Sequence, residues 1–181
     1  NSTEPIHLSN QYDYNQGSTL VDIFLVKRKD TLVEIVAYCL MPNHFHLLIK
    51  EKAEGGISKF MQKLLTAYTM YFNIKNERTG SLFEGKFKAK HVDQDEYLKY
   101  LISYIHLNPI KLIEPEWKET GIKDKNFAKK FLQTYSNSSY LDYSGIQRSK
   151  NILLNKTALP EYFESVRDFK EVVKDWLSFQ E

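Results

Sequence analysis

The sequence predicts an α+β protein, in which an antiparallel sheet has helices packed on one face and a mostly helical extension follows. Two short segments have the residue pattern of strands and are joined by a three-residue turn. Two longer segments downstream repeat apolar residues every three or four positions, which is the period of a helix. We expect a core domain in residues 1–115 and an extension in residues 116–181 that packs on it.

Composition and charge exclude several classes of protein. Hydrophobic residues make up 42% of the chain and charged residues 27%, as in a soluble globular protein. The net charge of +2 permits a local basic patch without by itself indicating a nucleic-acid partner. The single cysteine, Cys39, excludes an internal disulfide and fits the reducing cytoplasm, where we expect the protein. No apolar run is long enough for a membrane span and no signal peptide is evident, although a chain that begins at Asn1 leaves open a missing natural N-terminus.

The first elements are the least defined. Residues 1–19 are polar and rich in turn formers, which indicates a loop or a poorly ordered arm. Residues 20–26 form a short apolar run that fits a strand or a short helix.

A hairpin is predicted next. Residues 31–40 alternate apolar positions with others and are rich in β-branched side chains, as expected of a strand. Met41-Pro42-Asn43 is typical of a turn, because proline fixes φ and asparagine tolerates turn geometry. Residues 44–50 should therefore pair antiparallel with the first strand and lie in the interior of the sheet.

Two histidines lie on that second strand. Side chains alternate between faces, so His44 and His46 share one face and Phe45, Leu47 and Ile49 share the other. Neutral imidazole is the commonest metal ligand in proteins, so the pair is a candidate for half a metal site. Two hydrogen-bonded structural histidines are the alternative, and the pair alone does not decide between them.

A helix and a lysine-rich segment follow. Residues 57–73 have helical periodicity and should cover one face of the sheet. That periodicity favours core packing for Tyr68, Tyr71 and Phe72, which could otherwise stack on bases. Residues 82–92, read as a strand, would place three ammonium groups on one face: Lys86, Lys88 and Lys90. A solvated sheet edge is favoured by the spacing, and a ridge that contacts phosphates is the alternative.

The second helix should begin at Asp93, which can form a capping box with Glu96, and run to about residue 107, before Pro109. Tyr104 and Asn108 are four residues apart and so lie on one face of this helix. The spacing by itself favours a tyrosine that flanks the core.

The extension carries weaker patterns. We expect a connection over residues 116–121, a short basic helix over 125–135, a loop over 136–145 and an amphipathic helix over 168–179.

These pieces could form one site. If the second helix faces the sheet, the hydroxyl of Tyr104 and the side-chain oxygen of Asn108 approach a metal held by the histidines. Such a metal would polarise a phosphate, and Tyr104 could then attack phosphorus to give a phosphotyrosine. A phenol with a pKa of about 10 needs a nearby base or metal to become a good nucleophile.

Several segments match one family. Residues 37–49 read Ala-Tyr-Cys-Leu-Met-Pro-Asn-His-Phe-His-Leu-Leu-Ile and resemble the HUH signature of the single-tyrosine, IS200-like transposases. Residues 104–111 read Tyr-Ile-His-Leu-Asn-Pro-Ile-Lys and resemble the Tyr-Ile-x-x-Asn-Pro segment of the REP-associated tyrosine transposases, a branch of that superfamily. Residues 81–88 resemble the motif that connects these two, and residues 138–145 resemble the downstream extension of many members. The similarity extends over roughly residues 33–180.

The resemblance implies a ferredoxin-like sheet with the nucleophile on a helix beside it. It also implies cleavage and rejoining of single-stranded DNA, often at hairpin-forming ends, through a 5′-phosphotyrosine and with Mg²⁺ or Mn²⁺. His44 and His46 correspond to metal ligands and Tyr104 to the nucleophile. Asn108 corresponds to a third ligand, and the three lysines at 86, 88 and 90 become candidate DNA contacts.

The resemblance weakens at the N-terminus. The family begins with a strand of Tyr-His-Val type and an Asn-Arg-Gly turn, and nothing before Leu20 matches these. Either the strand is missing or the chain has diverged there. A relative that only binds hairpin DNA, and a metal hydrolase that does not use Tyr104, are the alternative functions. We expect no membrane partner, and a monomer is favoured over a dimer.

Overall fold

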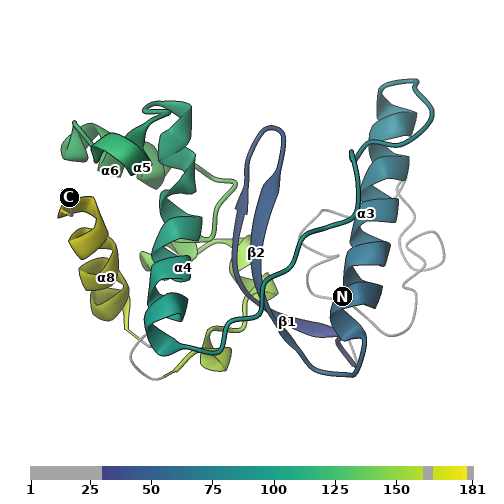
Figure 1. The fold of residues 1–181 in the computed structure, drawn as a ribbon, viewed down its shortest axis with the longest axis horizontal. Coiled ribbons are helices and arrows are strands. Elements are labelled where there is room, and N and C mark those ends of the chain that lie inside the picture. The colour runs from purple at the N-terminus through teal and green to yellow at the C-terminus, as the bar shows by residue number, and fades with distance from the viewer. Residues whose placement is uncertain (1–29, 161–164, 179–181) are drawn as a thin grey trace.

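The fold is built on a β-hairpin with a long helix on each side (Figure 1). The structure is a computed structural model, which describes residues 30–160 and 165–178. Strands β1 (Val33–Leu40) and β2 (Phe45–Glu51) pair antiparallel and form the sheet of the described residues. This confirms the α+β class and the predicted hairpin. The predictions for residues 1–19 and 20–26 fall outside the described residues.

The turn of the hairpin places the two histidines differently. The backbone N–H of Met41 donates to the carbonyl of His44 at 2.8 Å, so the turn includes His44 and the strand begins at Phe45. His46 faces Cys39 of β1 in the strand register. The prediction that both histidines lie in the interior of the sheet is therefore wrong for His44, which is exposed at the turn.

Both faces of the hairpin are covered, each by one helix. Helix α3 (Gly56–Lys75) packs Phe60 and Met61 against one face, which carries Phe45, Leu47 and Ile49. Helix α4 (Asp95–Leu107) packs against the other face and belongs to the larger core cluster, which also includes Leu48 of β2. The prediction that helices pack on one face is thus corrected. Apolar side chains point from β2 in both directions, so a single layer would leave half of them in water.

Helix α3 is longer than the sheet it covers. Its first turns are buried at Phe60 and Met61, whereas Tyr68 and Tyr71 are 49% and 57% exposed. The expectation that these tyrosines pack in the core is therefore wrong. The helical period runs on past the hairpin, and the described sheet is too narrow to cover the later turns.

The lysine-rich segment 82–92 is not a strand. It crosses from α3 to α4 in front of the hairpin (Figure 1) and pairs with no described strand. Lys86, Lys88 and Lys90 are all exposed along it. Alternation alone does not make a strand, because the backbone groups also need a neighbouring strand to pair with.

Helix α4 starts later than predicted and ends where expected. Its N-cap is Gln94, in an extended conformation, and Gln94 makes no side-chain capping bond. The predicted capping box of Asp93 and Glu96 is therefore wrong. The helix ends at Leu107, and a 3₁₀ turn, η2 (Asn108–Leu112), continues the chain with Pro109 in its first turn, where a proline costs no helical hydrogen bond.

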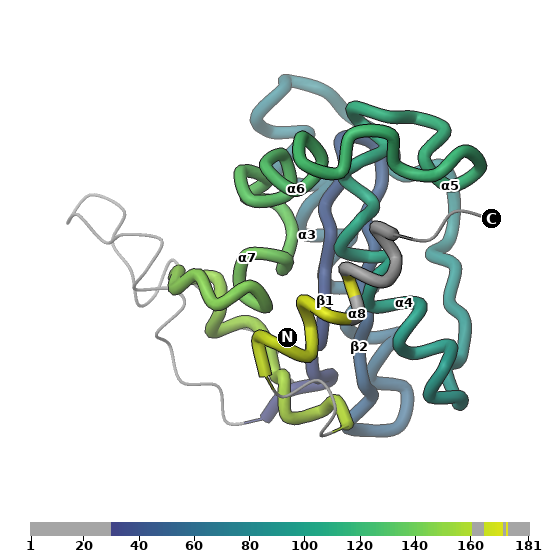
Figure 2. The backbone as a smooth tube through the Cα atoms, turned by 90° about the vertical axis from the view of Figure 1, so that its left-hand side faces the viewer, coloured from purple at the N-terminus to yellow at the C-terminus, as the bar shows by residue number. Residues whose placement is uncertain are grey.

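The extension folds against β1 and α4 (Figure 2). Helix α6 (Lys125–Thr134) confirms the predicted basic helix. Helix α8 (Val166–Ser178) confirms the predicted amphipathic helix and begins two residues earlier than expected. The predicted loop contains a buried helical turn, α7 (Tyr140–Tyr143). The remaining short elements are α5 (Trp117–Thr120), η3 (Ser149–Leu153) and η4 (Lys156–Ala158). No helix in the described ranges is long and apolar enough to cross a membrane.

The extension is joined to β1 by backbone hydrogen bonds. Leu40 N–H donates to the carbonyl of Asn137 at 2.8 Å, and Ser139 N–H donates to the carbonyl of Tyr38 at 2.9 Å. An isolated antiparallel bridge joins Cys39 to Ser138 between them. These bonds satisfy backbone groups on the edge of β1 that β2 does not reach, so the extension protects that edge.

Candidate active site

The two histidines lie side by side where the turn meets β2. Their rings are 5.0 Å apart between centroids and nearly perpendicular, at 88°. The Nδ1 atom of His44 lies 2.7 Å from Oδ1 of Asn43, which fixes the orientation of that exposed ring. His46 points from β2 toward the face that α4 covers.

Tyr104 meets His46 from α4. The two rings are 5.5 Å apart between centroids and meet edge to face at 82°. Tyr100, one turn earlier on the helix, stacks on Tyr104 at 5.9 Å with an interplanar angle of 13°. Two residues that are 58 positions apart in the sequence are therefore brought together, because α4 packs on the histidine face of the hairpin.

The environment keeps both imidazoles neutral. Burial lowers the pKa of His46 to about 4, with a further contribution from the neighbouring His44 and from Lys118. Burial and two lysines, Lys111 and Lys118, also lower the pKa of His44. A neutral imidazole is the form that binds a metal, and Nε2 of His46 is buried with no hydrogen-bond partner.

Asn108 follows Tyr104 by four residues and is buried. Its side chain is 1% exposed, at the junction of α4 and η2, and its Nδ2 atom has no hydrogen-bond partner. Rotating the amide by 180° would exchange nitrogen and oxygen at this position. The described residues hold no cluster of three or more His, Cys, Asp or Glu side chains suited to a metal, so a third protein ligand here would be of another type. An amide oxygen of Asn108 fits that requirement.

Lys118, which no sequence pattern predicted as a site residue, also contacts Tyr104. Its ammonium nitrogen donates a hydrogen bond to the phenol oxygen of Tyr104 at 2.8 Å and lies 4.1 Å from the centroid of the ring. Lys118 belongs to α5, a four-residue helix in the segment predicted as a plain connection. The sequence pattern gave no signal for this contact.

The three predicted DNA-binding lysines do not form one group. Lys90 lies over the ring of Tyr97, 4.1 Å from its centroid, and Tyr97 stacks on Tyr100 at 5.8 Å. Lys90 thus flanks the row of stacked tyrosines that ends at Tyr104. Lys86 instead lines a shallow pocket beside α3 with Met70 and Phe83, and Lys88 is exposed between them.

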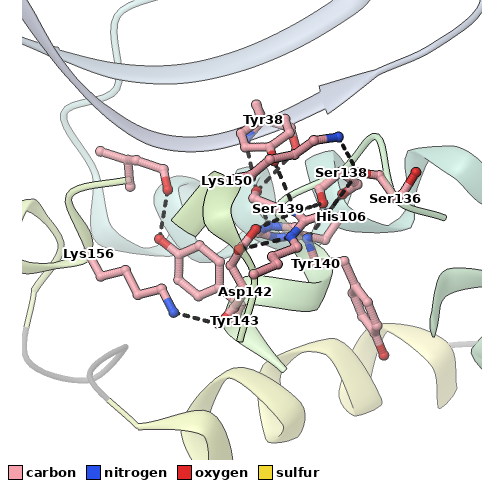
Figure 3. A network of polar contacts seen from close by, with 12 residues as sticks. Tyr38, His106, Ser136, Ser138, Ser139, Tyr140, Asp142, Tyr143, Lys150 and Lys156 are labelled. Carbon is pink, nitrogen blue, oxygen red and sulfur yellow. Dashed lines mark hydrogen bonds and ion pairs between the residues drawn. The ribbon is translucent and has the colours of Figure 1, made fainter. Parts of the chain in front are cut away.

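A second polar cluster, centred on His106, lies on the extension side of α4 (Figure 3). His106 is fully buried, with Nδ1 2.8 Å from the carbonyl oxygen of Ile102 and Nε2 2.8 Å from Oγ of Ser139. Burial lowers its pKa to about 3. Arg148 forms an ion pair with the buried Asp142 and donates to the phenol of Tyr38 at 2.9 Å. This cluster was also missed, apart from the resemblance of residues 138–145 to a family motif.

Comparison with known families gives one match. The family model described as "Transposase IS200 like" matches residues 11–108, which is more than half of the chain. The match begins well before residue 33, so the N-terminal limit expected for the similarity was wrong. No curated protein and no solved structure matches the chain. The family match supports a transposase function, with DNA as the partner. The chain belongs to the family of IS200-like transposases.

Proposed function

We propose that this transposase cleaves and rejoins single-stranded DNA by a covalent 5′-phosphotyrosine at Tyr104, with the help of Mg²⁺ or Mn²⁺. The observation that carries the proposal is the contact between the rings of Tyr104 and His46 at 5.5 Å. A nucleophile must lie close to the group that binds and polarises its phosphate. Two separate elements, α4 and β2, supply that pair here.

His44 and His46 would hold the metal, with the oxygen of Asn108 as a third ligand. The support is chemical: both imidazoles have lowered pKa values, and the Nε2 of His46 and the Nδ2 of Asn108 are buried and unpartnered. A buried polar atom without a partner costs about 1–3 kcal/mol, so such atoms call for a functional explanation. When bound, the ion would polarise the scissile phosphate as a Lewis acid.

The rest of the site orients Tyr104 and receives DNA. Stacking on Tyr100 restricts rotation of the Tyr104 ring, and the edge contact with His46 fixes the side from which its oxygen approaches. Lys86, Lys88 and Lys90 are exposed on the segment before α4 and could contact a single-stranded or hairpin backbone electrostatically. One chain supplies both the histidines and Tyr104, so the site does not require a second copy, which favours a monomer.

A covalent adduct would test the proposal. The protein is incubated with Mn²⁺ and labelled single-stranded oligonucleotides that tile the DNA flanking its gene, and the products are separated under denaturing conditions. We expect a denaturation-resistant protein–DNA adduct in the wild type and none in Tyr104→Phe. Cleavage that survives Tyr104→Phe would instead support a hydrolase that does not use the tyrosine. Binding without cleavage would support a relative that only binds DNA.

A further inference from the structure

Lys118 is held next to the phenol oxygen of Tyr104 by a short anchored element. Trp117, the residue before it, is 4% exposed in the core, and its backbone N–H donates to the carbonyl of Glu114 at 3.2 Å. A buried tryptophan fixes α5 against the domain, so the side chain of the adjacent lysine extends from a rigid backbone. Its ammonium nitrogen then lies 2.8 Å from the phenol oxygen.

We propose that Lys118 is a catalytic residue that stabilises negative charge on the phenol oxygen of Tyr104, both when this oxygen attacks DNA and when it leaves. This inference rests on the proposed function of Tyr104 as the nucleophile. It adds a residue from the extension, which lies outside the matched residues 11–108 and outside the candidate set of histidines, tyrosine and asparagine.

The charge of Lys118 is available for this role. Lys118 makes no ion pair with a carboxylate of the described residues, and its hydrogen bond and its cation–π contact are both with Tyr104. Its field also reaches both histidines, whose pKa values it helps to lower. A protonated lysine has three donors and no acceptor, so its bond to an oxygen strengthens as that oxygen becomes negative.

Lys118 has the same role in both directions of the reaction, cleavage and rejoining. In cleavage the phenol proton passes to solvent, a bond forms between the phenol oxygen and phosphorus, and the bond between phosphorus and the 3′-oxygen breaks. The 3′-oxygen then takes a proton from solvent. In rejoining, a 3′-hydroxyl attacks phosphorus, loses its proton to solvent, and expels the phenolate. Lys118 keeps its proton throughout and donates to the phenol oxygen of Tyr104 while that oxygen carries negative charge.

The competing explanation is a surface hydrogen bond without a catalytic role. Lys118 is exposed, and exposed charged contacts contribute little to stability. Such a bond would leave the rate of adduct formation unchanged when it is removed. A catalytic contact would be needed only in the transition state, so its loss would lower the rate and leave folding and DNA affinity unchanged.

The test compares Lys118→Met with Lys118→Arg and with Lys59→Met. Lys59 is exposed on α3, on the opposite face of the hairpin, and its replacement removes the same charge away from the site. At saturating Mn²⁺ and DNA, we expect Lys118→Met to slow adduct formation on the order of tenfold, as for the loss of one charge-assisted hydrogen bond. Rejoining by an added 3′-hydroxyl strand should slow by a similar factor. Lys118→Arg should stay within about threefold of the wild type, because it keeps the charge and the donor.

Each outcome decides between the explanations. Unchanged DNA affinity and thermal stability in Lys118→Met, with slower cleavage and rejoining, would support the proposal. An unchanged rate in Lys118→Met, while Tyr104→Phe still abolishes the adduct, would overturn it and leave the proposed function intact. An equal loss in Lys59→Met would also overturn it, because the effect would then be one of net charge. A wild type that forms no adduct would refute the function and, with it, the role of Lys118.

Discussion

Two clusters that each pair a histidine with tyrosines lie on opposite sides of α4. On the hairpin side, His46 meets Tyr104, and on the extension side His106 meets Tyr140 and Tyr143. Burial lowers the pKa of both histidines. The clusters differ in their hydrogen bonding: both ring nitrogens of His106 have partners, whereas Nε2 of His46 has none.

The difference indicates different roles. In the His106 cluster nearly every polar group is matched: Arg148 bonds to Asp142, Tyr38 and two backbone carbonyls, and Tyr143 donates to the carbonyl of Val36. Fully satisfied buried networks hold a fold in one arrangement. The His46 cluster leaves buried polar atoms without partners and keeps an ammonium beside a phenol. Such an arrangement is fully stabilised only when a ligand binds. The first cluster stabilises the protein and the second is the candidate site of chemistry.

The largest expected effect comes from removing one tyrosine hydroxyl in each cluster, which distinguishes their roles. Tyr104→Phe should lower adduct formation about a thousandfold or more, because the bond to phosphorus can form only at the phenol oxygen. Tyr143→Phe should leave cleavage intact but lower the free energy of unfolding by about 1–2 kcal/mol, since the buried carbonyl of Val36 loses its partner. Adduct assays and urea denaturation measure the two effects. A reversed pattern would contradict the assignment of roles.

Breaking the ion pair of the extension should destabilise the fold. Asp142→Asn removes the buried partner of Arg148, and we expect a loss of about 3 kcal/mol in the free energy of unfolding. Arg167→Gln is the matched control, because it breaks the exposed pair with Glu171 and should cost less than about 0.5 kcal/mol. Equal losses in the two variants, measured by urea denaturation, would show that the cluster has no special structural role.

The buried His106 should make stability fall in acid. Its pKa is lowered from 6.5 to about 3 in the folded protein, so below pH 6.5 the unfolded chain binds a proton that the folded chain does not. The stabilisation is fully present above pH 6.5 and is lost toward pH 3, at up to about 1.4 kcal/mol per pH unit. His106 should therefore account for a loss of about 2 kcal/mol between pH 7 and pH 5.

His106→Gln checks this slope, since it removes the titrating group whatever its effect on absolute stability. Denaturation curves across this range should be flatter in the variant than in the wild type. An identical slope would assign the acid sensitivity to other groups.

The smallest effect concerns the metal. Mn²⁺ at ten times its dissociation constant should stabilise the wild type by about 1.4 kcal/mol, because it binds the folded site. His46→Ala should abolish this stabilisation, while His91→Ala, which removes an exposed histidine outside the predicted ligand set, should keep it. Thermal denaturation with and without Mn²⁺ measures the difference. A response that persists in His46→Ala would place the ion elsewhere.

Local patterns predicted much of the fold. Pro42 and the alternation around it were enough for the hairpin, and the apolar periods gave α3 and the end of α4 to within about two residues. They failed where an element depends on a distant neighbour. Residues 82–92 alternate like a strand but find no strand to pair with, and Tyr68 continues a helical stripe past the edge of the sheet.

The candidate site was predictable in part for the same reason. The positions of His46 and Tyr104 follow from strand and helix periods together with a family motif, whereas His44 lies in the turn before the strand. Lys118 reaches Tyr104 only because the thirteen residues between them fold back on α4, and no spacing rule predicts that return. His106 likewise meets Ser139 across 33 residues.

The most direct test of Tyr104 as the nucleophile is to locate the bond between protein and DNA. The adduct formed by the wild type with Mn²⁺ is digested with protease and nuclease, and the modified peptide is sequenced by mass spectrometry. We expect a nucleotide phosphate on Tyr104. Attachment to Tyr100 or Tyr97, which stack in the same row on α4, or to any residue away from the histidines, would contradict it.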